Sequence, residues 1–503
     1  MKTMNKKDII LILVLAVFLP LSLDTLAQNE EDALRYSQLF DAGLTARSLS
    51  MGGAFGALGA DMSEMSINPA GIAVYRRSVF SITPTYMYDN THATYLGKRA
   101  YDSNSHFSLG NIGMVYTYNT GQDNGWVNFN FGFSSQKRTD FYKNMTISAI
   151  NDHSSMLDYF ADYADGKTLD MLDDYGEGLA FDTWLIDTVS GNPTQYETVL
   201  SQYGDFPNST YGESQRRQVS TYGNITETNF NISANYGYKF YVGGTFTIRS
   251  LNYHHKMKHS EDDLNNEIFD FNYFDYIFYL NTRGTAYAFS MGAIFRPVPI
   301  LRLGAAFHFP TVYKLHDSYS SIIESGFDTP DDEGYSTYSS ESPDGYYDYK
   351  LNTPFRFIGS VGFQIKKLGV VSMDYEYIDY PGMKFQNRGD NYDFSPTNEN
   401  IRSAYKGTSN IKAGGEIHFG SVFLRCGVAY YGSPYRSAEL NKNASSVSYS
   451  TGIGYKTRMF SVDFGYAYLT HTENYVLYPN NDRDYASTWS GRHRVSGTIS
   501  FNF

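Results

Sequence analysis

From residue 78 to the end, the sequence is a series of segments in which apolar and polar residues alternate, separated by connections that are short and long in turn. The short connections have two to six residues and fall near residues 120–125, 240, 297–299, 367–368, 420–421 and 456–457. Alternation with a period of two indicates strands that are apolar on one face. Short turns at one end and long loops at the other are typical of a transmembrane β-barrel, whose short turns are periplasmic. A series of soluble β-sandwiches, the alternative class, has no reason to sort its connections by length.

The alternating segments number fourteen, which predicts an all-β fold: an antiparallel 14-stranded transmembrane barrel over residues 78–503. Within the second segment, Gly110 predicts a β-bulge that moves the outward face from Phe107 and Leu109 to Met114 and Tyr116. The expected strands are 79–88, 105–119, 126–138, 226–239, 241–256, 285–296, 300–309, 353–366, 369–379, 408–419, 422–431, 446–455, 458–469 and 492–503. The expected extracellular loops are 139–225, 257–284, 310–352, 380–407 and 470–491.

The composition agrees with this class and excludes others. Aromatic residues make up 17% of the chain and charged residues 18%, with a mean hydropathy of -0.40, which excludes a bundle of transmembrane helices. The net charge of -13 and the lack of a basic stripe exclude nucleic acid as a partner. A single cysteine, Cys426, cannot form an internal disulfide.

The two ends of the chain carry export and assembly signals. Lys2, Lys6 and Lys7 precede an apolar run over residues 9–19, and Thr25-Leu26-Ala27 forms a small-x-small cleavage site, so residues 1–27 are expected to be a cleaved signal peptide. An exported, aromatic-rich barrel implies the Gram-negative outer membrane and contact with its lipid. The last strand ends at Phe503, and a terminal aromatic resembles the signal read by the barrel assembly machinery, the partner expected there.

Residues 28–77, before the first strand, form an N-terminal extension and a plug. The stretch over residues 46–77 reads ARSLSMGGAFGALGADMSEMSINPAGIAVYRR, too rich in Gly and Ala for a stable amphipathic helix and too irregular for a strand. Such a segment folds compactly when something encloses it, and the barrel is the enclosure that the rest of the chain provides.

This stretch resembles the N-terminal hatch of the FadL/TodX family of outer-membrane channels for hydrophobic compounds. The resemblance covers residues 46–73 and lies in Met51-Gly52-Gly53-Ala54-Phe55, the Ala60-Asp61 step and Asn68-Pro69-Ala70. It implies a fourteen-stranded barrel whose hatch closes the lumen, and we expect the barrel to be a monomer. It also implies passive uptake of long-chain fatty acids or similar hydrophobic molecules, with ligand captured by extracellular loops and released when the hatch rearranges. The implied hatch and gate residues are Gly52, Gly53, Phe55, Asp61, Asn68, Pro69 and Ala70.

An aromatic-rich stretch, EIFDFNYFDYIFYL over residues 267–280, is the candidate for capturing an apolar ligand. Exposed aromatics at this density mark an interaction surface. The alternative is that two strands extend beyond the membrane and these rings form the interfacial girdle. The candidate ligand-binding aromatics are Phe269, Phe271, Tyr273, Phe274 and Tyr276.

Alternation places several charged side chains in the lumen, and the basic ones, Arg249, Arg356, Lys412 and Arg425, are candidates to bind a ligand carboxylate. The alternative is that they pair across the lumen and hold the plug, because a barrel of this size must fill its interior.

No metal site or cofactor is expected. His254, His255 and His259 stand together, but histidines at a loop edge without cysteines or paired carboxylates are commonly solvated. The acidic stretch over residues 328–344 lacks the spacing of an EF-hand loop and is expected to be a solvated loop.

An enzyme is not expected, because no G-x-S-x-G motif occurs and no Ser, His and acidic residue are spaced to suggest a triad. The alternative function left open is a non-transporting outer-membrane barrel that serves the secretion or assembly of surface proteins.

Overall fold

The computed structural model describes residues 29–40, 44–152, 154–201, 213–266, 268–365, 368–479 and 484–503. The expected signal peptide, residues 1–27, lies outside these ranges. Among the described residues, no helix is both long and apolar enough to cross a membrane.

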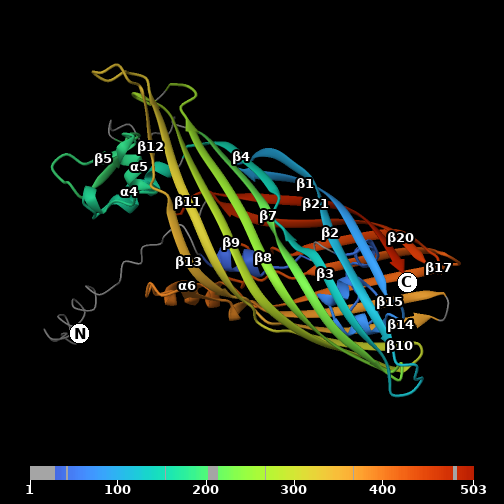
Figure 1. Cartoon of the computed structure of the whole chain (residues 1–503). Coiled ribbons are helices and arrows are strands. Elements are labelled where there is room, and N and C mark those ends of the chain that lie inside the picture. Colours follow the sequence, from blue (N-terminus) through green and yellow to red (C-terminus); the bar gives the residue numbers. More distant parts are fainter. Residues whose placement is uncertain are drawn as a thin grey trace, which may run out of the picture.

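The strands close into one antiparallel barrel, which confirms the predicted fold class (Figure 1). Closure is made by β1 (Val79–Tyr95) and β21 (Tyr485–Asn502), which pair from Val79↔Asn502 to Thr94↔Ser487. Fourteen strand positions make up the wall. Four of these positions are interrupted strands, in which one element continues the line of the one before it.

In chain order, the wall consists of β1, β2 (Lys98–Asn119), β3 (Trp126–Asp140) continued by β4 (Lys143–Asn151), β7 (Glu213–Tyr236), β8 (Phe240–Asp262), β9 (Phe271–Val298), β10 (Leu301–His308) continued by β11 (Val312–Phe327), β13 (Gly345–Asn352) continued by β14 (Arg356–Ile365), β15 (Gly369–Asp379) continued by β16 (Lys384–Asn387), β17 (Gly407–Phe419), β18 (Val422–Tyr431), β19 (Ser446–Lys456), β20 (Phe460–Val476) and β21.

Shorter elements lie inside the barrel or at one end of it. Inside are α2 (Glu30–Ser37), α3 (Ala46–Ser50) and the 3-10 turns η1 (Met62–Met65) and η2 (Pro69–Val74). Residues 154–201, between β4 and β7, form a small cap, visible at the upper left of Figure 1. It contains α4 (Met156–Ala164), η3 (Leu169–Met171), α5 (Glu177–Asp182) and the hairpin of β5 (Ile186–Thr188) and β6 (Tyr196–Thr198). The remaining elements are β12 (Thr337–Glu341), which pairs with β11, η4 (Tyr380–Gly382) and α6 (Ser395–Ala404).

The predicted bulge in the second strand is confirmed. Thr83 pairs with Asn111 and Pro84 with Leu109, so Gly110 is the extra residue on β2. A bulge at this point accommodates Pro84, which has no N–H to donate to the ladder. On either side of it, Phe107 and Met114 both face outward, 71% and 45% exposed.

Several segments expected to be loops are strands, and these expected boundaries are wrong. The prediction made loops of 139–225, 257–284, 310–352, 380–407 and 470–491, but β4, β7, β8, β9, β11, β13, β16, β20 and β21 all extend into them. The extensions keep a buried inner face, as Phe274, Tyr276, Tyr313 and Leu315 show. On β7 and β11 the outer face of the extension is largely polar, as Arg216, Gln218, Lys314 and His316 show, so the apolar-out, polar-in pattern of a membrane strand is inverted there.

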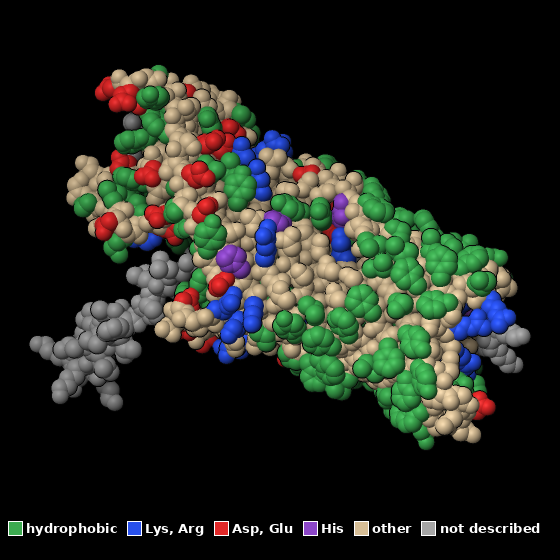
Figure 2. Space-filling view, in the orientation of Figure 1, with side chains coloured by type: hydrophobic (Ala, Val, Ile, Leu, Met, Phe, Trp, Pro, Cys, Tyr) green, Lys and Arg blue, Asp and Glu red, His purple; other side chains and the backbone are tan. Residues whose placement is uncertain are grey.

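On the face shown in Figure 2, exposed apolar side chains gather towards the end with the short turns and form an apolar band. Large exposed side chains form it, among them Phe133, Phe230, Phe289 and Phe464. Such a band is the surface that a barrel presents to lipid. On β7 the outer face becomes polar after Phe230, with Thr228, Thr226 and Asn224, and beyond Tyr222 it continues with Ser220, Gln218 and Arg216. Residues 213–221 and their partners 255–262 therefore lie outside the membrane-spanning part.

Candidate functional site

Residues 44–75 fold inside the barrel and cross its lumen; we call them the hatch. Its apolar core packs Leu49, Met51 and Phe55 against the wall residues Ala306 and Ile358. Backbone groups of the hatch also bond to wall side chains. Asp374 of β15 accepts hydrogen bonds from the N–H groups of Phe55 (3.0 Å) and Gly56 (2.9 Å).

The turn at Asn68 joins three parts of the structure. The Asn68 side-chain amide donates to the carbonyl of Gly56 (2.6 Å) and to that of Ala293 on β9 (3.3 Å). Its Oδ1 accepts from the N–H of Ala70 (3.1 Å), which caps η2. Asn68 is therefore a buried connection between two hatch segments and the wall.

The other predicted hatch residues lie in the same compact unit. Gly52 and Gly53 have φ angles of 65° and 74°, where glycine is favoured. Asp61 accepts hydrogen bonds from the Thr45 hydroxyl (2.8 Å) and the Ser63 N–H (3.0 Å). Pro69 and Ala70 are buried, and Asn231 of β7 donates to the Pro69 carbonyl (3.1 Å).

Glycines on the inner face of the wall make room for the hatch backbone. A Cβ on Gly427 of β18 would lie 2.8 Å from the Cα of Met51, and one on Gly304 of β10 would lie 2.9 Å from the carbonyl carbon of Gly56. Gly414 and Gly465 face Met51 and Ala46 in the same way. The wall sequence is thus fitted to a closely packed hatch.

The predicted lumen charges are buried and lie in ion pairs. Arg425 pairs with Glu416 (2.6 Å) and Asp463 (2.7 Å), and Arg47 of the hatch also pairs with Glu416 (3.0 Å). Farther round the wall, Arg249 pairs with Glu227 (2.9 Å), while Arg356 and Lys412 both pair with Glu376 (3.0 and 3.7 Å). The expectation that such charges pair across the lumen is wrong, because these wall pairs join neighbouring or next-neighbouring strands; the Arg47–Glu416 pair agrees with the expectation that they hold the plug.

The predicted aromatic capture loop is wrong in its location. Phe271, Phe274 and Tyr276 are buried on the inner face of β9, and Tyr276 packs edge-on against Phe160 of α4 at 5.5 Å. Tyr273 is half-buried and Phe269 is 64% exposed. Phe271, Phe274 and Tyr276 belong to one large apolar cluster that fills the barrel between α2 and the cap.

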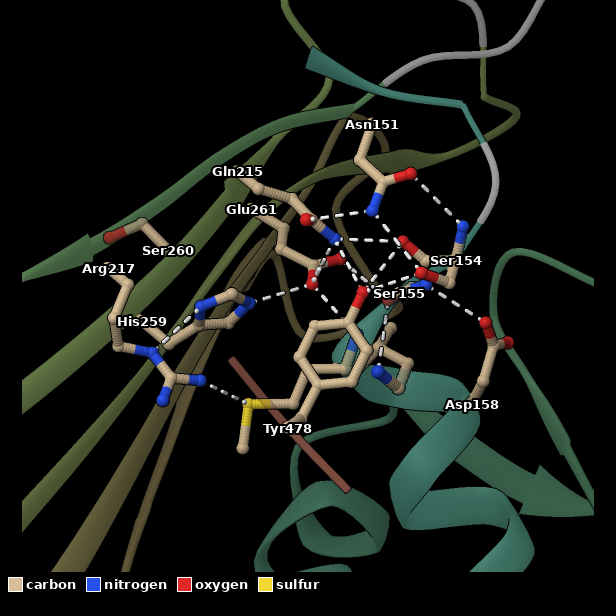
Figure 3. A network of polar contacts seen from close by, with 12 residues as sticks. Asn151, Ser154, Ser155, Asp158, Gln215, Arg217, His259, Ser260, Glu261 and Tyr478 are labelled. Carbon is tan, nitrogen blue, oxygen red and sulfur yellow. Dashed lines mark hydrogen bonds and ion pairs between the residues drawn. The ribbon is translucent and has the colours of Figure 1, made fainter. Parts of the chain in front are cut away.

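A buried polar network fixes the cap to the wall (Figure 3). Glu261 of β8 accepts hydrogen bonds from the Ser155 hydroxyl (2.6 Å) and the Met156 N–H (2.8 Å) at the N-terminus of α4. His259 bonds to the same carboxylate through Nε2 (2.8 Å) and accepts from Arg217 at Nδ1 (3.2 Å). His259 is therefore not solvated, contrary to expectation.

The other two histidines and the acidic stretch have local partners. His254 stacks on Tyr222 at 4.3 Å, and His255 lies beside Phe278 at 6.1 Å. In the acidic stretch, Asp331 accepts from the Tyr335 N–H (2.8 Å) within an exposed turn. Among the residues that the structure describes, no group of His, Cys, Asp and Glu could hold a metal ion.

Cavities lie between the hatch and the wall, and one of about 10 Å³ adjoins Ser66 and Ile67. A larger one, about 180 Å³, is polar and lies beside Arg47, Asp61 and Glu416. Another, about 30 Å³, combines an apolar lining with two arginines of β21, Arg492 and Arg494; its other lining residues are Phe40, Leu44, Leu49, Gly52, Tyr431, Ser448, Ala467 and Leu469. We call it the arginine pocket.

The wall is interrupted next to the arginine pocket. The ladder between β2 and β3 stops at Asn111↔Gln136, and β4 pairs with β7 but, in these described strands, not with β2. Side-chain contacts replace the ladder, for example Thr91 Oγ1 to the Asn144 carbonyl at 2.6 Å. We call residues 137–142 the wall kink.

Arg492 connects the arginine pocket to the wall kink. Its guanidinium pairs with Asp89 of β1 (2.6 Å) and donates to the carbonyls of Asp140 (3.3 Å) and Tyr142 (3.2 Å). Sequence reasoning missed both arginines of the pocket, because it began the last strand at Arg492 and considered only its outward face. Extending the alternation from Val495 towards the N-terminus would have placed Arg494 in the lumen.

Comparison with known proteins gives one family. Residues 201–501 match the family model described as "Outer membrane protein transport protein (OMPP1/FadL/TodX)". No match is found among curated proteins.

Solved structures of this family share the fold. A Pseudomonas aeruginosa FadL homologue superposes with a TM-score of 0.55 at 13% identity, covering 93% of this chain and 99% of that one. The P. putida toluene transporter TodX superposes with a TM-score of 0.51 at 11% identity, covering 92% and 99%. Since the family model spans residues 201–501, more than half of the sequence, this chain belongs to the FadL/TodX family of outer-membrane transport proteins.

Proposed function

We propose that this protein is a passive outer-membrane channel for long-chain fatty acids or similar apolar carboxylates. The observation that carries the proposal is the arginine pocket, in which Phe40, Leu44 and Leu469 lie beside Arg492 and Arg494. An apolar lining with a few convergent polar groups is the usual form of a small-molecule site. Guanidinium groups bind carboxylates with paired hydrogen bonds.

The size of the pocket supports a gated mechanism. A cavity of about 30 Å³ holds little more than a water molecule, whereas ligand sites occupy roughly 300–1,000 Å³. One side of the pocket consists of Phe40, Leu44, Leu49 and Gly52, which belong to the N-terminal segment and the hatch. An alkyl chain can therefore enter only when this segment moves, and the described arrangement is the closed one.

The wall kink offers the exit. A ligand carboxylate bound to Arg492 competes with the carbonyls of Asp140 and Tyr142 and with the carboxylate of Asp89 for the same N–H groups. Because no ladder joins β4 to β2 along these described strands, a side opening at the kink costs few backbone hydrogen bonds. Ligand then passes through the wall beside the outward-facing Phe107 and Leu109.

Uptake of oleate into proteoliposomes tests the proposal. Arg494→Gln is expected to lower uptake at least tenfold, and Arg494→Lys less, since an ammonium keeps the charge but not the paired geometry. Arg436→Gln, in the connection between β18 and β19, is the control. Uptake that is unchanged in Arg494→Gln contradicts the pocket. Absence of uptake in the unchanged protein, together with co-purification of a stable secreted partner, would favour the secretion alternative.

The route has its own test. In a Cys426→Ser background, Tyr142→Cys places a single thiol at the wall kink, and Tyr449→Cys places one on the outer face of β19, where the tyrosine is 59% exposed. A bulky maleimide is expected to block oleate uptake only in the Tyr142→Cys protein. Equal uptake by both labelled proteins would exclude the kink as the exit and leave the pocket proposal standing.

A further inference from the structure

Basic side chains gather on the outer face of four strands that share one side of the wall. They are Arg283 of β9, Lys314 of β11, Lys350 of β13 and Lys384 of β16; we call them the basic patch. Arg283, Lys314 and Lys384 are exposed and Lys350 is half-buried. Figure 2 shows Lys and Arg side chains in this middle zone, between the apolar band and the acidic end with the cap.

Strand register brings these side chains close together. Lys314 is directly opposite Lys350, and Arg283 is opposite His316, two residues along β11 from Lys314. Lys384 is opposite Asn352, two residues from Lys350. Directly opposed Cβ atoms in a sheet are about 5 Å apart and diagonal neighbours about 7–8 Å. Like charges at such positions repel, so an uncompensated patch destabilises the wall.

The protein does not neutralise this patch with its own carboxylates. Asp348, the nearest acidic residue on the same face of β13, pairs with His316 (2.8 Å) and Arg388 (3.1 Å). Lys258, farther along on β8, has its own partner in Asp275 (2.9 Å). Within the described ranges, the four patch residues form no comparable ion pair.

The patch lies at the edge of the lipid-facing surface. Val312 and Tyr287 pair directly and are 45% and 63% exposed, so they belong to the apolar band. The next outward-facing pair along the same strands is Lys314 and Thr285. Lipid headgroups lie at this level of a barrel, just beyond its apolar band.

We propose that the basic patch binds the phosphate groups of an outer-leaflet lipid whose acyl chains rest on the band beside Tyr287 and Val312. Phosphate oxygens accept charge-assisted hydrogen bonds from Lys and Arg, and anionic headgroups attract each basic residue near a membrane surface. A lipid satisfies both surfaces at once, whereas a free phosphate ion would contact only the charges. The continuity of patch and band therefore selects a lipid.

Native mass spectrometry of the full chain in detergent tests this site. The probes are a bisphosphorylated lipid A and the same lipid with both phosphates removed. The patch variant is Lys314→Gln with Lys350→Gln. The matched control is Lys239→Gln with Lys442→Gln, which removes two exposed charges outside the patch. With about 1 kcal/mol per basic residue, the patch variant should bind the phosphorylated lipid about 30-fold more weakly, and the control should bind like the unchanged protein.

Three outcomes would overturn the proposal. The first is equal affinity of the patch variant and the unchanged protein for the phosphorylated lipid. The second is equal affinity of the unchanged protein for the two lipids. The third is competition by inorganic phosphate at the same molar concentration as the lipid, which would reveal a site for a free anion. A thermal unfolding midpoint no lower than that of the unchanged protein, in both variants, shows that the fold is retained.

Discussion

The side-chain amide of Asn68 lies 2.6 Å from the carbonyl oxygen of Gly56, twelve residues earlier in the chain, and this bond closes the hatch on itself. The same amide reaches the carbonyl of Ala293 on β9 at 3.3 Å. One buried side chain therefore couples the shape of the hatch to its attachment to the wall.

Replacing Asn68 by Ala is expected to loosen the hatch and leave the barrel intact. The change leaves two buried carbonyls without this donor and removes the cap of η2, at a cost of about 1–3 kcal/mol. Hydrogen exchange should accelerate over residues 51–74 and not in β17–β20. Asn68→Asp keeps the acceptor for the Ala70 N–H but loses the donor to Gly56 and Ala293, so it distinguishes the effect of the η2 cap from that of the two bonds to the carbonyls. Hydrogen exchange in Asn68→Ala as slow as in the unchanged protein would show that the hydrogen bonds of Asn68 do not hold the hatch.

Gly427→Ala is expected to displace the hatch from the wall. Its new Cβ would lie 2.8 Å from the Cα of Met51, and backbone cannot yield as a flexible side chain can. Gly497→Ala on β21 is the matched control, because a Cβ there meets nothing within 4 Å. The first variant should raise proteolysis of the hatch and the leak of small solutes through proteoliposomes, and the second should do neither. Equal behaviour of the two variants would contradict a close fit at Gly427.

Arg425→Gln is expected to destabilise the barrel strongly. It leaves Asp463 without this cation and Glu416 with Arg47 alone among its arginine partners. Removing one partner of a buried ion pair costs about 3–5 kcal/mol. Thermal unfolding followed by circular dichroism should show a lower midpoint for Arg425→Gln than for Arg425→Lys, which keeps the charge. A midpoint equal to that of the unchanged protein would show that water reaches this pair.

The sequence was sufficient to predict the membrane-spanning half of the barrel and not the half beyond it. In β15 and β18 the expected and observed bounds agree. Outward residues there face lipid and are apolar, so apolar and polar residues alternate regularly along both strands. Beyond the band, as at Tyr276 and Tyr313, the buried face is the inner one and depends on α2 and the cap, which are distant in the chain. The contacts inside the barrel could not be predicted either. Arg425 pairs with Asp463, 38 residues away, because the strand register brings them together, and that register is fixed only when the sheet closes.

Docking of the cap is expected to weaken as pH rises, because Glu213 and Glu261 share one buried site outside the membrane-spanning part. Burial and the charge of Glu261 raise the pKa of Glu213 well above its usual value of 4.5. The Glu213 carboxyl therefore keeps its proton, which it can donate in a hydrogen bond to the Glu261 carboxylate. A group whose pKa is higher in the folded than in the unfolded state stabilises the fold fully below its unfolded-state pKa. This stabilisation is lost as the pH rises through its folded-state pKa. The docked helix α4 should therefore exchange its amide hydrogens faster as this proton leaves.

Neighbouring groups titrate in other windows, which makes the test selective. Burial raises the pKa of Asp158 to about 6, so its contribution is lost between 3.8 and about 6. Burial lowers the pKa of His259 below 6.5, so its contribution to the stability of the docked cap is lost only on acidification. The pKa of Glu261 is also lowered, so its contribution to that stability changes only below pH 4.5. A loss of protection in α4 that continues above about pH 7 then belongs to Glu213.

Glu213→Gln keeps the shape of the side chain but cannot titrate, so it should abolish that loss. Glu261→Gln should loosen α4 at every pH, because it weakens the acceptor of Ser155 and Met156. A pH dependence above about 7 that survives in Glu213→Gln would contradict the shared proton.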